Sequence, residues 1–305
     1  MPTLPLDEAI LRTLLYADIF DYPLTPEEIC YFLIETSASR AAVLDRLEHS
    51  PWLQARVAHS AGYVTLRNRQ GLGAVRAARA AASAALWPAA RQWGAVLGAL
   101  PFVRLVAVTG ALAVDNAPAQ DDIDYLIVTT PGRVWLARAL AVGVVRLARL
   151  WRVGLCPNYV LAHSALAQRR RDLFVAHDVV QMVPLAGLEV YAALRAANPW
   201  TAAYLPQAER PLRAEPDQSP RGLARAAQRA LEWLLGGRLG DALEAWERRR
   251  KLDRFAPAAR QAHAAAELDA EHVKGHFDDH GHPILQRFEA RLRAHLPAGD
   301  AVEAG

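Results

Sequence analysis

The amino-acid sequence predicts a mixed α/β (α+β) fold with a small N-terminal domain and a helical C-terminal region. Three observations lead to this prediction. Apolar residues recur at helical spacing towards both ends, the middle of the chain alternates strand-like and helical runs, and a Pro-rich polar stretch follows that middle part. The 305 residues are enough for two or three domains.

Three helices are expected near the N-terminus. Residues 6–20 carry apolar side chains at helical spacing. Thr25 followed by Pro26 supplies an N-cap and a proline in the first turn, which predicts that a second helix begins there. A third helix is expected at residues 39–48.

A hairpin is expected to follow these helices. Two short β-leaning pieces, 53–57 and 63–66, flank a loop that contains Gly62. Three helices closed by a hairpin resemble a winged-helix domain, which we place at residues 1–70. The Ala-rich residues 71–100 are expected to be connector helices, with Pro88 starting a second helix or kinking the first.

The next hundred residues, 101–205, alternate strand and helix patterns and are expected to form one α/β domain. The polar stretch 206–222 contains four prolines and is expected to be a linker or a long excursion, and residues 223–298 are expected to form a helical C-terminal domain. The elements expected in the α/β domain are strands at 103–108, 122–129 and 158–162 and helices at 132–151 and 172–183.

Composition limits the classes of function. Lys plus Arg is 35 and Asp plus Glu is 32, so the net charge of +3 is too small for a general nucleic-acid binder. Cys30 and Cys156 are the only cysteines, which excludes a disulfide framework and favours a reducing compartment. No basic-then-apolar leader and no apolar run of spanning length is found, so we expect a cytoplasmic protein without a membrane partner.

The most informative stretch joins two expected strands. Asp122 and Asp124 are two apart in a strand, so we expect them to project from one face with ~7 Å between their Cα atoms. Two carboxylates that face one way repel each other unless a cation lies between them, and Mg²⁺ is a cation that carboxylates hold while substrate phosphates complete its shell. Gly110 ends the preceding strand and would let a phosphate approach the backbone closely.

This pattern resembles the signature of the DNA polymerase β-like nucleotidyltransferase superfamily, carried here by Gly110-Ala111 and Asp122-Ile123-Asp124. The resemblance spans residues 102–183 and implies a nucleotidyltransferase-type mixed sheet. It also implies that Asp122 and Asp124 are catalytic and bind the metal, and that Thr109, Gly110 and Ala111 hold the triphosphate.

Two positions depart from the family pattern. Ala111 stands where the family has Ser or Gly, which removes a hydroxyl and leaves the backbone available. Asn158 stands on the strand expected to carry a third acid. An amide supplies an oxygen ligand without charge, so the predicted metal ligands are Asp122, Asp124 and Asn158, and the metal would be held more weakly.

Two functions are therefore predicted. The first is an enzyme that uses Mg²⁺ (or Mn²⁺) and transfers an NMP from an NTP to a hydroxyl of an unidentified acceptor, which could be a small molecule, a protein or an RNA. The alternative is a catalytically weak or inactive nucleotide-binding module, whose winged helix recognises nucleic acid or a protein. In both, nucleic-acid binding through residues 1–70 would be weak and electrostatic.

Several charged groups have two interpretations. His272 and His276 would share a helix face at a spacing that can bind zinc, or they would mark a polar helix end. A further alternative is that the nucleotide is faced by Lys274, His276 or Asp279. The remaining cationic groups, for which solvated surface is favoured over phosphate binding, are 169–171, 248–251, Arg56, Arg67 and Arg69.

Overall fold

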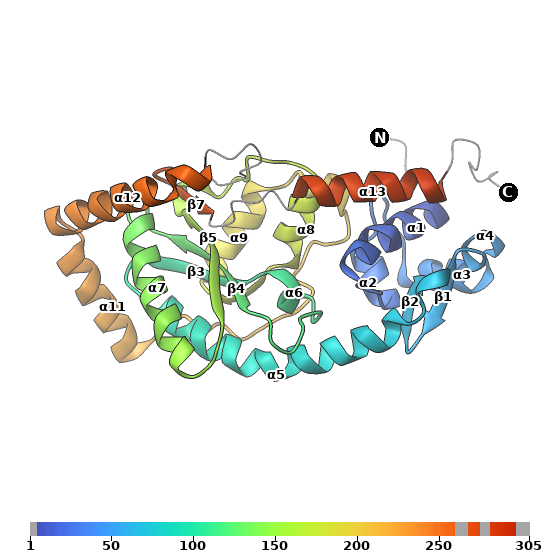
Figure 1. Cartoon of the computed structure of the whole chain (residues 1–305), viewed down its shortest axis with the longest axis horizontal. Helices are drawn as coiled ribbons and strands as arrows, with labels where there is room; N and C mark the ends of the chain where they lie inside the picture. The colour runs from blue at the N-terminus through green and yellow to red at the C-terminus, as the bar shows by residue number, and fades with distance from the viewer. Residues whose placement is uncertain (1–4, 260–267, 275–280, 297–305) are drawn as a thin grey trace.

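The structure is a computed structural model that describes residues 5–259, 268–274 and 281–296. The molecule is elongated, with an N-terminal module at one end and a five-stranded sheet with its helices towards the other (Figure 1). Helices α5 (Leu72–Gly98) and α13 (Gly281–His295) run between the two parts on opposite edges. The predicted mixed α/β fold is confirmed.

The N-terminal module has the three predicted helices and the predicted hairpin. One expectation about the hairpin is wrong: its first strand does not span 53–57. Ser50 caps a short helix there, accepting a hydrogen bond from the Leu53 N–H at 3.3 Å. The elements of the module are α1 (Leu6–Ala17), α2 (Pro26–Tyr31), α3 (Arg40–His49), α4 (Pro51–Gln54), β1 (Val57–Ser60) and β2 (Tyr63–Leu66).

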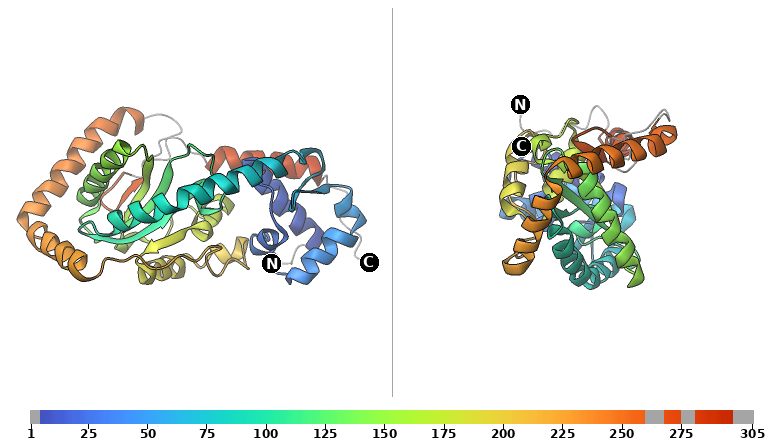
Figure 2. Two further views of the ribbon diagram at one scale, coloured as in Figure 1. Left: turned by 90° about the horizontal axis from the view of Figure 1, so that it is seen from below. Right: turned by 90° about the vertical axis from the view of Figure 1, so that its left-hand side faces the viewer.

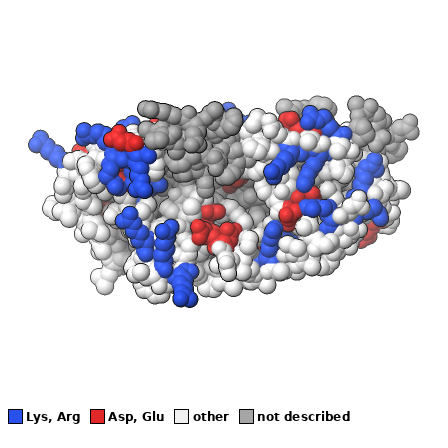
Figure 3. Space-filling view, viewed as in Figure 1, with Lys and Arg blue, Asp and Glu red and all other residues white. Residues whose placement is uncertain are grey.

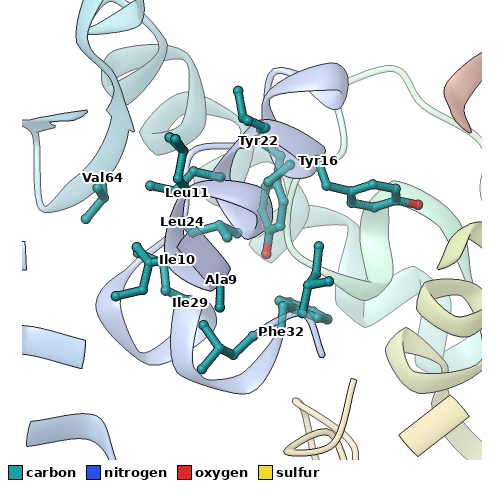
Figure 4. Packing of buried hydrophobic residues seen from close by; sticks show 14 of the residues in the cluster. Ala9, Ile10, Leu11, Tyr16, Tyr22, Leu24, Ile29, Phe32 and Val64 are labelled. Atoms are coloured by element: carbon teal, nitrogen blue, oxygen red, sulfur yellow. The ribbon is translucent and has the colours of Figure 1, made fainter. Parts of the chain in front are cut away.

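The start of α2 shows how local sequence fixes this module. The Thr25 hydroxyl accepts a hydrogen bond from the Glu28 N–H at 3.1 Å, and the Glu28 carboxylate accepts one from the Thr25 N–H at 2.8 Å. Apolar side chains from α1, α2 and the hairpin then form one core (Figure 4). Tyr16 belongs to this core, and its ring points away from the other labelled side chains, towards the rest of the molecule.

A single helix, α5, replaces the expected pair of connector helices. Pro88 lies inside it and does not start a second helix. The helix is anchored at two points, because Arg76 is buried against the N-terminal module and Trp87, next to Pro88, is buried against the sheet. This packing outweighs the hydrogen bond that proline removes.

The sheet has the strand order β6-β3-β4-β5-β7, and only the β4–β5 pair of neighbours is parallel. The predictions for β3 and β4 are confirmed to within one residue. The third strand begins earlier than expected. The helix predicted at 172–183 ends at Gln181, and a strand that was not predicted begins at Val183. The five strands are β3 (Val103–Val108), β4 (Ile123–Thr129), β5 (Leu155–Ala162), β6 (Val183–Ala186) and β7 (His272–Lys274).

Helices cover both faces of this sheet. The N-terminus of α7 is capped from far along the chain, since the Glu244 carboxylate accepts hydrogen bonds from the N–H groups of Trp135 and Leu136 at 3.0 and 2.7 Å. The helices of this part are α6 (Gly110–Ala113), α7 (Val134–Leu150), α8 (Leu173–Gln181), α9 (Leu188–Ala197) and α10 (Thr201–Tyr204).

The C-terminal elements spread over the whole molecule. Residues 206–221 follow the body, with the Gln218 N–H donating to the Leu185 carbonyl at 2.7 Å. Helices α11 (Gly222–Leu235) and α12 (Arg238–Ala259) lie at the end remote from the N-terminal module, and α12 packs on α7 (Figures 1 and 2). The chain returns through β7 to α13, which packs on α1 and α8. Within the described segments, no helix is long and apolar enough to cross a membrane.

Candidate functional site

A cavity of about 940 Å³ lies where the N-terminal module meets the sheet. This volume is within the range of small-molecule sites. Most of its wall is apolar, and the polar side chains come from segments that are far apart in the sequence. The polar and charged residues on the wall include Arg79, Thr109, Asn116, Asp124, Asn158, Gln168, Arg170, Asp178 and Lys274.

At Gly110 the backbone comes close to the carboxylate of Asp124. The φ of Gly110 is +68°, and a Cβ at this position would lie 2.5 Å from Oδ2 of Asp124. The Thr109 N–H donates to the Asp124 carbonyl at 3.0 Å, which ties the end of β3 to the start of β4. Only glycine suits this turn, both for its left-handed backbone and for the space it leaves. Thr109, Gly110 and Ala111 all line the cavity beside Asp124.

Asn158 lies against Asp124, as the strand alignment predicted. Its amide nitrogen donates to Oδ1 of Asp124 at 2.5 Å, and its amide oxygen accepts from the Cys156 thiol at 2.6 Å. Burial raises the pKa of the Cys156 thiol to about 11, so the thiol stays protonated and remains a donor at neutral pH. The amide oxygen is therefore directed towards Cys156, and the amide nitrogen is the group presented to the carboxylate.

Burial raises the pKa of Asp124 to about 6. The hydrogen bond from Asn158 acts in the opposite direction, and the nearby carboxylates of Asp121 and Asp122 add to the rise. Figure 3 shows acidic side chains gathered at the centre of one face, close to α6 and the start of β4. Asp124 thus lies in a negative environment that a cation would stabilise.

Asp122 occupies a different place from Asp124. It precedes β4, is exposed, and is not among the described residues that line the cavity. Its carboxylate fills the space beside Gly154, where a Cβ would lie 1.8 Å from Oδ1. The structure therefore brings together Asp124, Asn158 and Gly110, and it leaves Asp122 outside the cavity.

A second carboxylate, Asp178 on α8, faces the cavity and was not predicted from the sequence. The residue is surrounded by protein yet keeps exposed surface, and that surface is part of the cavity wall. Burial raises the pKa of Asp178 to about 7, with Lys274 acting against the rise. The signal available in the sequence was a polar His177-Asp178 pair inside an otherwise apolar helix, 172–183.

Two cations share this part of the cavity with Asp178. Lys274 reaches it from β7, with its Nζ 5.6 Å from the centre of the Tyr159 ring. Arg170 lies just before α8 and pairs with Asp172. Both belong to groups that the sequence analysis singled out.

His177 lies on α8 and packs against the N-terminal module. Its ring stacks on Tyr16, with 4.1 Å between the ring centres, and also on Phe32 at 5.6 Å. Burial lowers the pKa of His177 to about 4, so the ring is neutral at physiological pH. This stack is an apolar wall of the cavity and not a titrating group.

The expected helix carrying His272 and His276 is not formed. His272 lies in strand β7, because its backbone pairs with Leu161 of β5, and its ring stacks on Tyr159. His276 and Asp279 lie outside the described residues. In the described parts of the chain, no group of three or more His, Cys, Asp and Glu side chains is arranged to hold a metal ion.

Several of the other basic side chains are paired within the molecule. On the N-terminal module, Arg56 stacks on Trp52 and Arg69 pairs with Asp18 at 3.0 Å, and Arg67 donates to the Ala55 carbonyl at 3.1 Å. The remaining pairs are Arg169 with Asp269, and Arg250 and Lys251 with Glu247. These contacts favour structural roles for these cations.

Comparison with protein-family models, with curated proteins and with solved structures finds no match for this chain.

Proposed function

We propose that this protein binds a nucleoside triphosphate with Mg²⁺ (or Mn²⁺) in the cavity and transfers its nucleotidyl group to a hydroxyl acceptor. The observation that carries the proposal is the contact between Gly110 and Asp124, because it joins a side-chain-free turn to a buried carboxylate at one point of a cavity large enough for a nucleotide. The resemblance of this stretch to the DNA polymerase β-like nucleotidyltransferases supports it.

The residues present fit one divalent ion held mainly by Asp124. Burial is the main cause of its raised pKa and two nearby acids add to the rise, and a divalent ion would favour the charged form against both effects. When bound, such an ion would neutralise triphosphate charge and orient the reacting phosphate. Asn158 supports Asp124 by donating a hydrogen bond to Oδ1, so its predicted role as a metal ligand requires the amide to turn over.

The other polar groups on the cavity wall would bind the triphosphate and accept a proton. The backbone at Thr109, Gly110 and Ala111 would contact the triphosphate, and Arg170 and Lys274 would offset its charge. Asp178 is the candidate to accept the proton of the attacking hydroxyl, because it is the carboxylate on the cavity wall with basic neighbours. The stacked Tyr16 and the apolar wall around it suit a base or an apolar part of the acceptor.

A second candidate function is nucleotide binding without catalysis. Two observations favour it: Asn158 presents its amide nitrogen to Asp124, and Asp122 is outside the cavity. In that case the N-terminal module would recognise a partner protein or nucleic acid in response to nucleotide. The few cations on that module have partners, so any nucleic-acid contact would be weak and fall steeply with salt.

The proposed setting is the cytoplasm. Cys30 and Cys156 are free thiols, which suits a reducing compartment, and the proposed substrates are abundant there.

Thermal unfolding with each of the four NTPs, with and without Mg²⁺ or Mn²⁺, tests the proposal. A ligand that binds only the folded state stabilises it, by about 2.7 kcal/mol at a ligand concentration of a hundred times its Kd, and so raises the melting temperature. We expect a rise that needs both NTP and metal. Asp124→Asn should remove it, while Asp253→Asn, a change of the same kind on exposed α12, should leave it intact. A rise that persists in Asp124→Asn would contradict the assignment.

A further inference from the structure

Helix α11 binds the body of the protein with its polar side. Nε2 of Gln228 donates to the carbonyls of Gly98 and Leu100 at 3.0 and 2.8 Å. The Glu232 carboxylate accepts from the Phe102 N–H at 2.7 Å and pairs with Arg104. Surface helices ordinarily do the reverse and turn their apolar side inwards. The orientation of α11 therefore leaves its apolar side facing solvent.

That apolar side is long and well exposed. Leu223 is 89% exposed, Trp233 is 85% exposed and Leu234 is 57% exposed. Leu231 is also exposed, and the alanines between these residues are exposed as well. An apolar surface of this kind marks an interaction site. Figure 1 shows α11 at the end of the molecule remote from the N-terminal module, and no residue of α11 lines the cavity, so this surface is separate from the proposed nucleotide site.

The residues along the centre of this apolar surface are spaced symmetrically along the helix. Leu223, Ala227, Ala230 and Leu234 follow one another at intervals of four, three and four residues, the alternation of a coiled-coil seam. The same order of residues is met when the helix is followed in the opposite direction. A two-fold dimer needs a surface that is complementary to itself, and a stripe with this symmetry meets that need in an antiparallel pair.

We propose that α11 pairs antiparallel with α11 of a second copy of this chain. Leu223 would lie against Leu234 of the second copy, and Ala227 against Ala230. The two alanines at the centre allow the helices to approach closely. Beside this seam, the large Trp233 would lie next to the small Ala226 of the second copy, so large and small side chains alternate across the interface.

A second copy fits this surface better than a lipid surface does. A helix that binds lipid gains most from large apolar side chains along the centre of its apolar face, whereas α11 has Ala227 and Ala230 there. The polar side of α11 carries Arg225 and Arg229 as well as Glu232, which contacts the body, so charge does not separate the two occupants and the small side chains of the seam do. With 14 residues and a rise of about 1.5 Å each, α11 is ~21 Å long, so the interface is small and the dimer is expected to be weak.

Sedimentation equilibrium of the full chain tests for the dimer. We expect reversible dimerisation between ~1 and ~100 μM, the weak end of the range for interfaces of this size. Leu234→Arg should raise the dissociation constant at least about tenfold, the effect of one buried charge opposite an apolar group. Val75→Arg adds the same charge at an exposed apolar position of α5, near the N-terminal module, and should change nothing. A monomer throughout this range, or an equal loss in both variants, would overturn the proposal.

Cross-linking tests the antiparallel arrangement. Two single variants, Leu223→Cys and Leu234→Cys, are oxidised separately and as a mixture. In the antiparallel pair, position 223 of one copy and position 223 of the other are eleven residues apart along the helix, ~16 Å, which is too far for a disulfide, whereas positions 223 and 234 are opposite each other. We therefore expect a cross-linked dimer only in the mixture, with the unchanged chain as the control for Cys30 and Cys156.

Three outcomes would contradict this arrangement. Cross-links in each variant alone would show a parallel pair. A dimer that forms without any cross-link would place the interface elsewhere. Flotation of the protein with anionic vesicles, lost in Leu234→Arg, would show that α11 binds lipid.

Discussion

Asp124 and Asp178 face the same cavity, and burial raises the pKa of both, yet their neighbours differ in charge. Asp124 lies near Asp121 and Asp122 and receives one amide hydrogen bond. Asp178 lies near Lys274 and Arg170 and also near the acidic Asp172, and Lys274 has the largest electrostatic effect on it. Burial alone would make the two carboxylates equivalent. The sign of the surrounding charge separates their roles, because it gives Asp124 a place for a cation and Asp178 a place where its own charge is partly balanced.

The comparison is tested most strongly by removing each charge in turn. Asp124→Asn should lower nucleotidyl transfer by about 100-fold or more, because it removes the group that binds the metal. Asp178→Asn should lower kcat by at least about 100-fold with little change in the KM for NTP, as expected for a group that accepts a proton. Release of labelled pyrophosphate from NTP measures both. An equal loss of NTP binding in the two variants would show that the two carboxylates have the same role.

Gly110 ties Asp124 to the turn, and this link can be tested with a matched pair of glycines. Gly110→Ala places a Cβ 2.5 Å from Oδ2 of Asp124, at a φ of +68°. Gly132 has a φ of +72° and nothing within 4 Å of a Cβ. Both changes should cost about 1–2 kcal/mol of unfolding free energy for the left-handed backbone. Only Gly110→Ala should also weaken NTP binding, and similar binding in both variants would contradict the contact.

The Asp124 side of the cavity contains the amide of Asn158, whose role can be tested by substitution. Asn158→Asp replaces a hydrogen-bond donor by a like charge, so without metal the two carboxylates should repel and lower the melting temperature at pH 8. Mg²⁺ should restore that temperature and bind about tenfold more tightly. Asn158→Ala is the control, because it loses the hydrogen bond without adding charge and should recover much less with Mg²⁺ than Asn158→Asp does. Identical behaviour of the two variants would exclude a metal at Asp124.

The dependence of stability on pH gives the smallest expected effect. A carboxylate whose pKa is higher in the folded state than the ordinary 3.8 binds more protons when folded, so stability falls as pH rises. Without metal, we expect stability to fall from pH ~4 to about 6 through Asp124 and to about 7 through Asp178. Mg²⁺ should flatten the Asp124 contribution. Chemical unfolding at several pH values measures this slope, and a slope unchanged by Asp124→Asn or Asp178→Asn would contradict the assignments.

The sequence predicted the Asp124 side of the cavity because local rules determine it. Gly110 and Asp124 lie at the ends of two adjacent strands, and strand periodicity with a turn glycine is enough to bring them close. The capping box at Thr25 and the strand β3 were predictable for the same reason. The exclusion of Asp122 was not predictable, since it depends on the space beside Gly154, thirty-two residues further along the chain.

The Asp178 side depends on assembly of the whole molecule. Lys274 reaches the cavity only because residues 272–274 add a strand to the far edge of the sheet, where helical periodicity had suggested a helix. Asp178 faces the cavity because α8 is held between the sheet and the N-terminal module by the His177 stack. No short sequence window contains these contacts. The same holds for α5, where tertiary packing carries one helix through Pro88.

The most direct test of the central claim is titration calorimetry of Mg²⁺ with NTP into the unchanged protein and into Asp124→Asn and Asp178→Asn. The account predicts metal-dependent binding to the unchanged protein, its loss in Asp124→Asn, and retention in Asp178→Asn with a dissociation constant changed less than about threefold. Metal-dependent binding of unchanged affinity in Asp124→Asn would contradict the claim that this carboxylate organises the site.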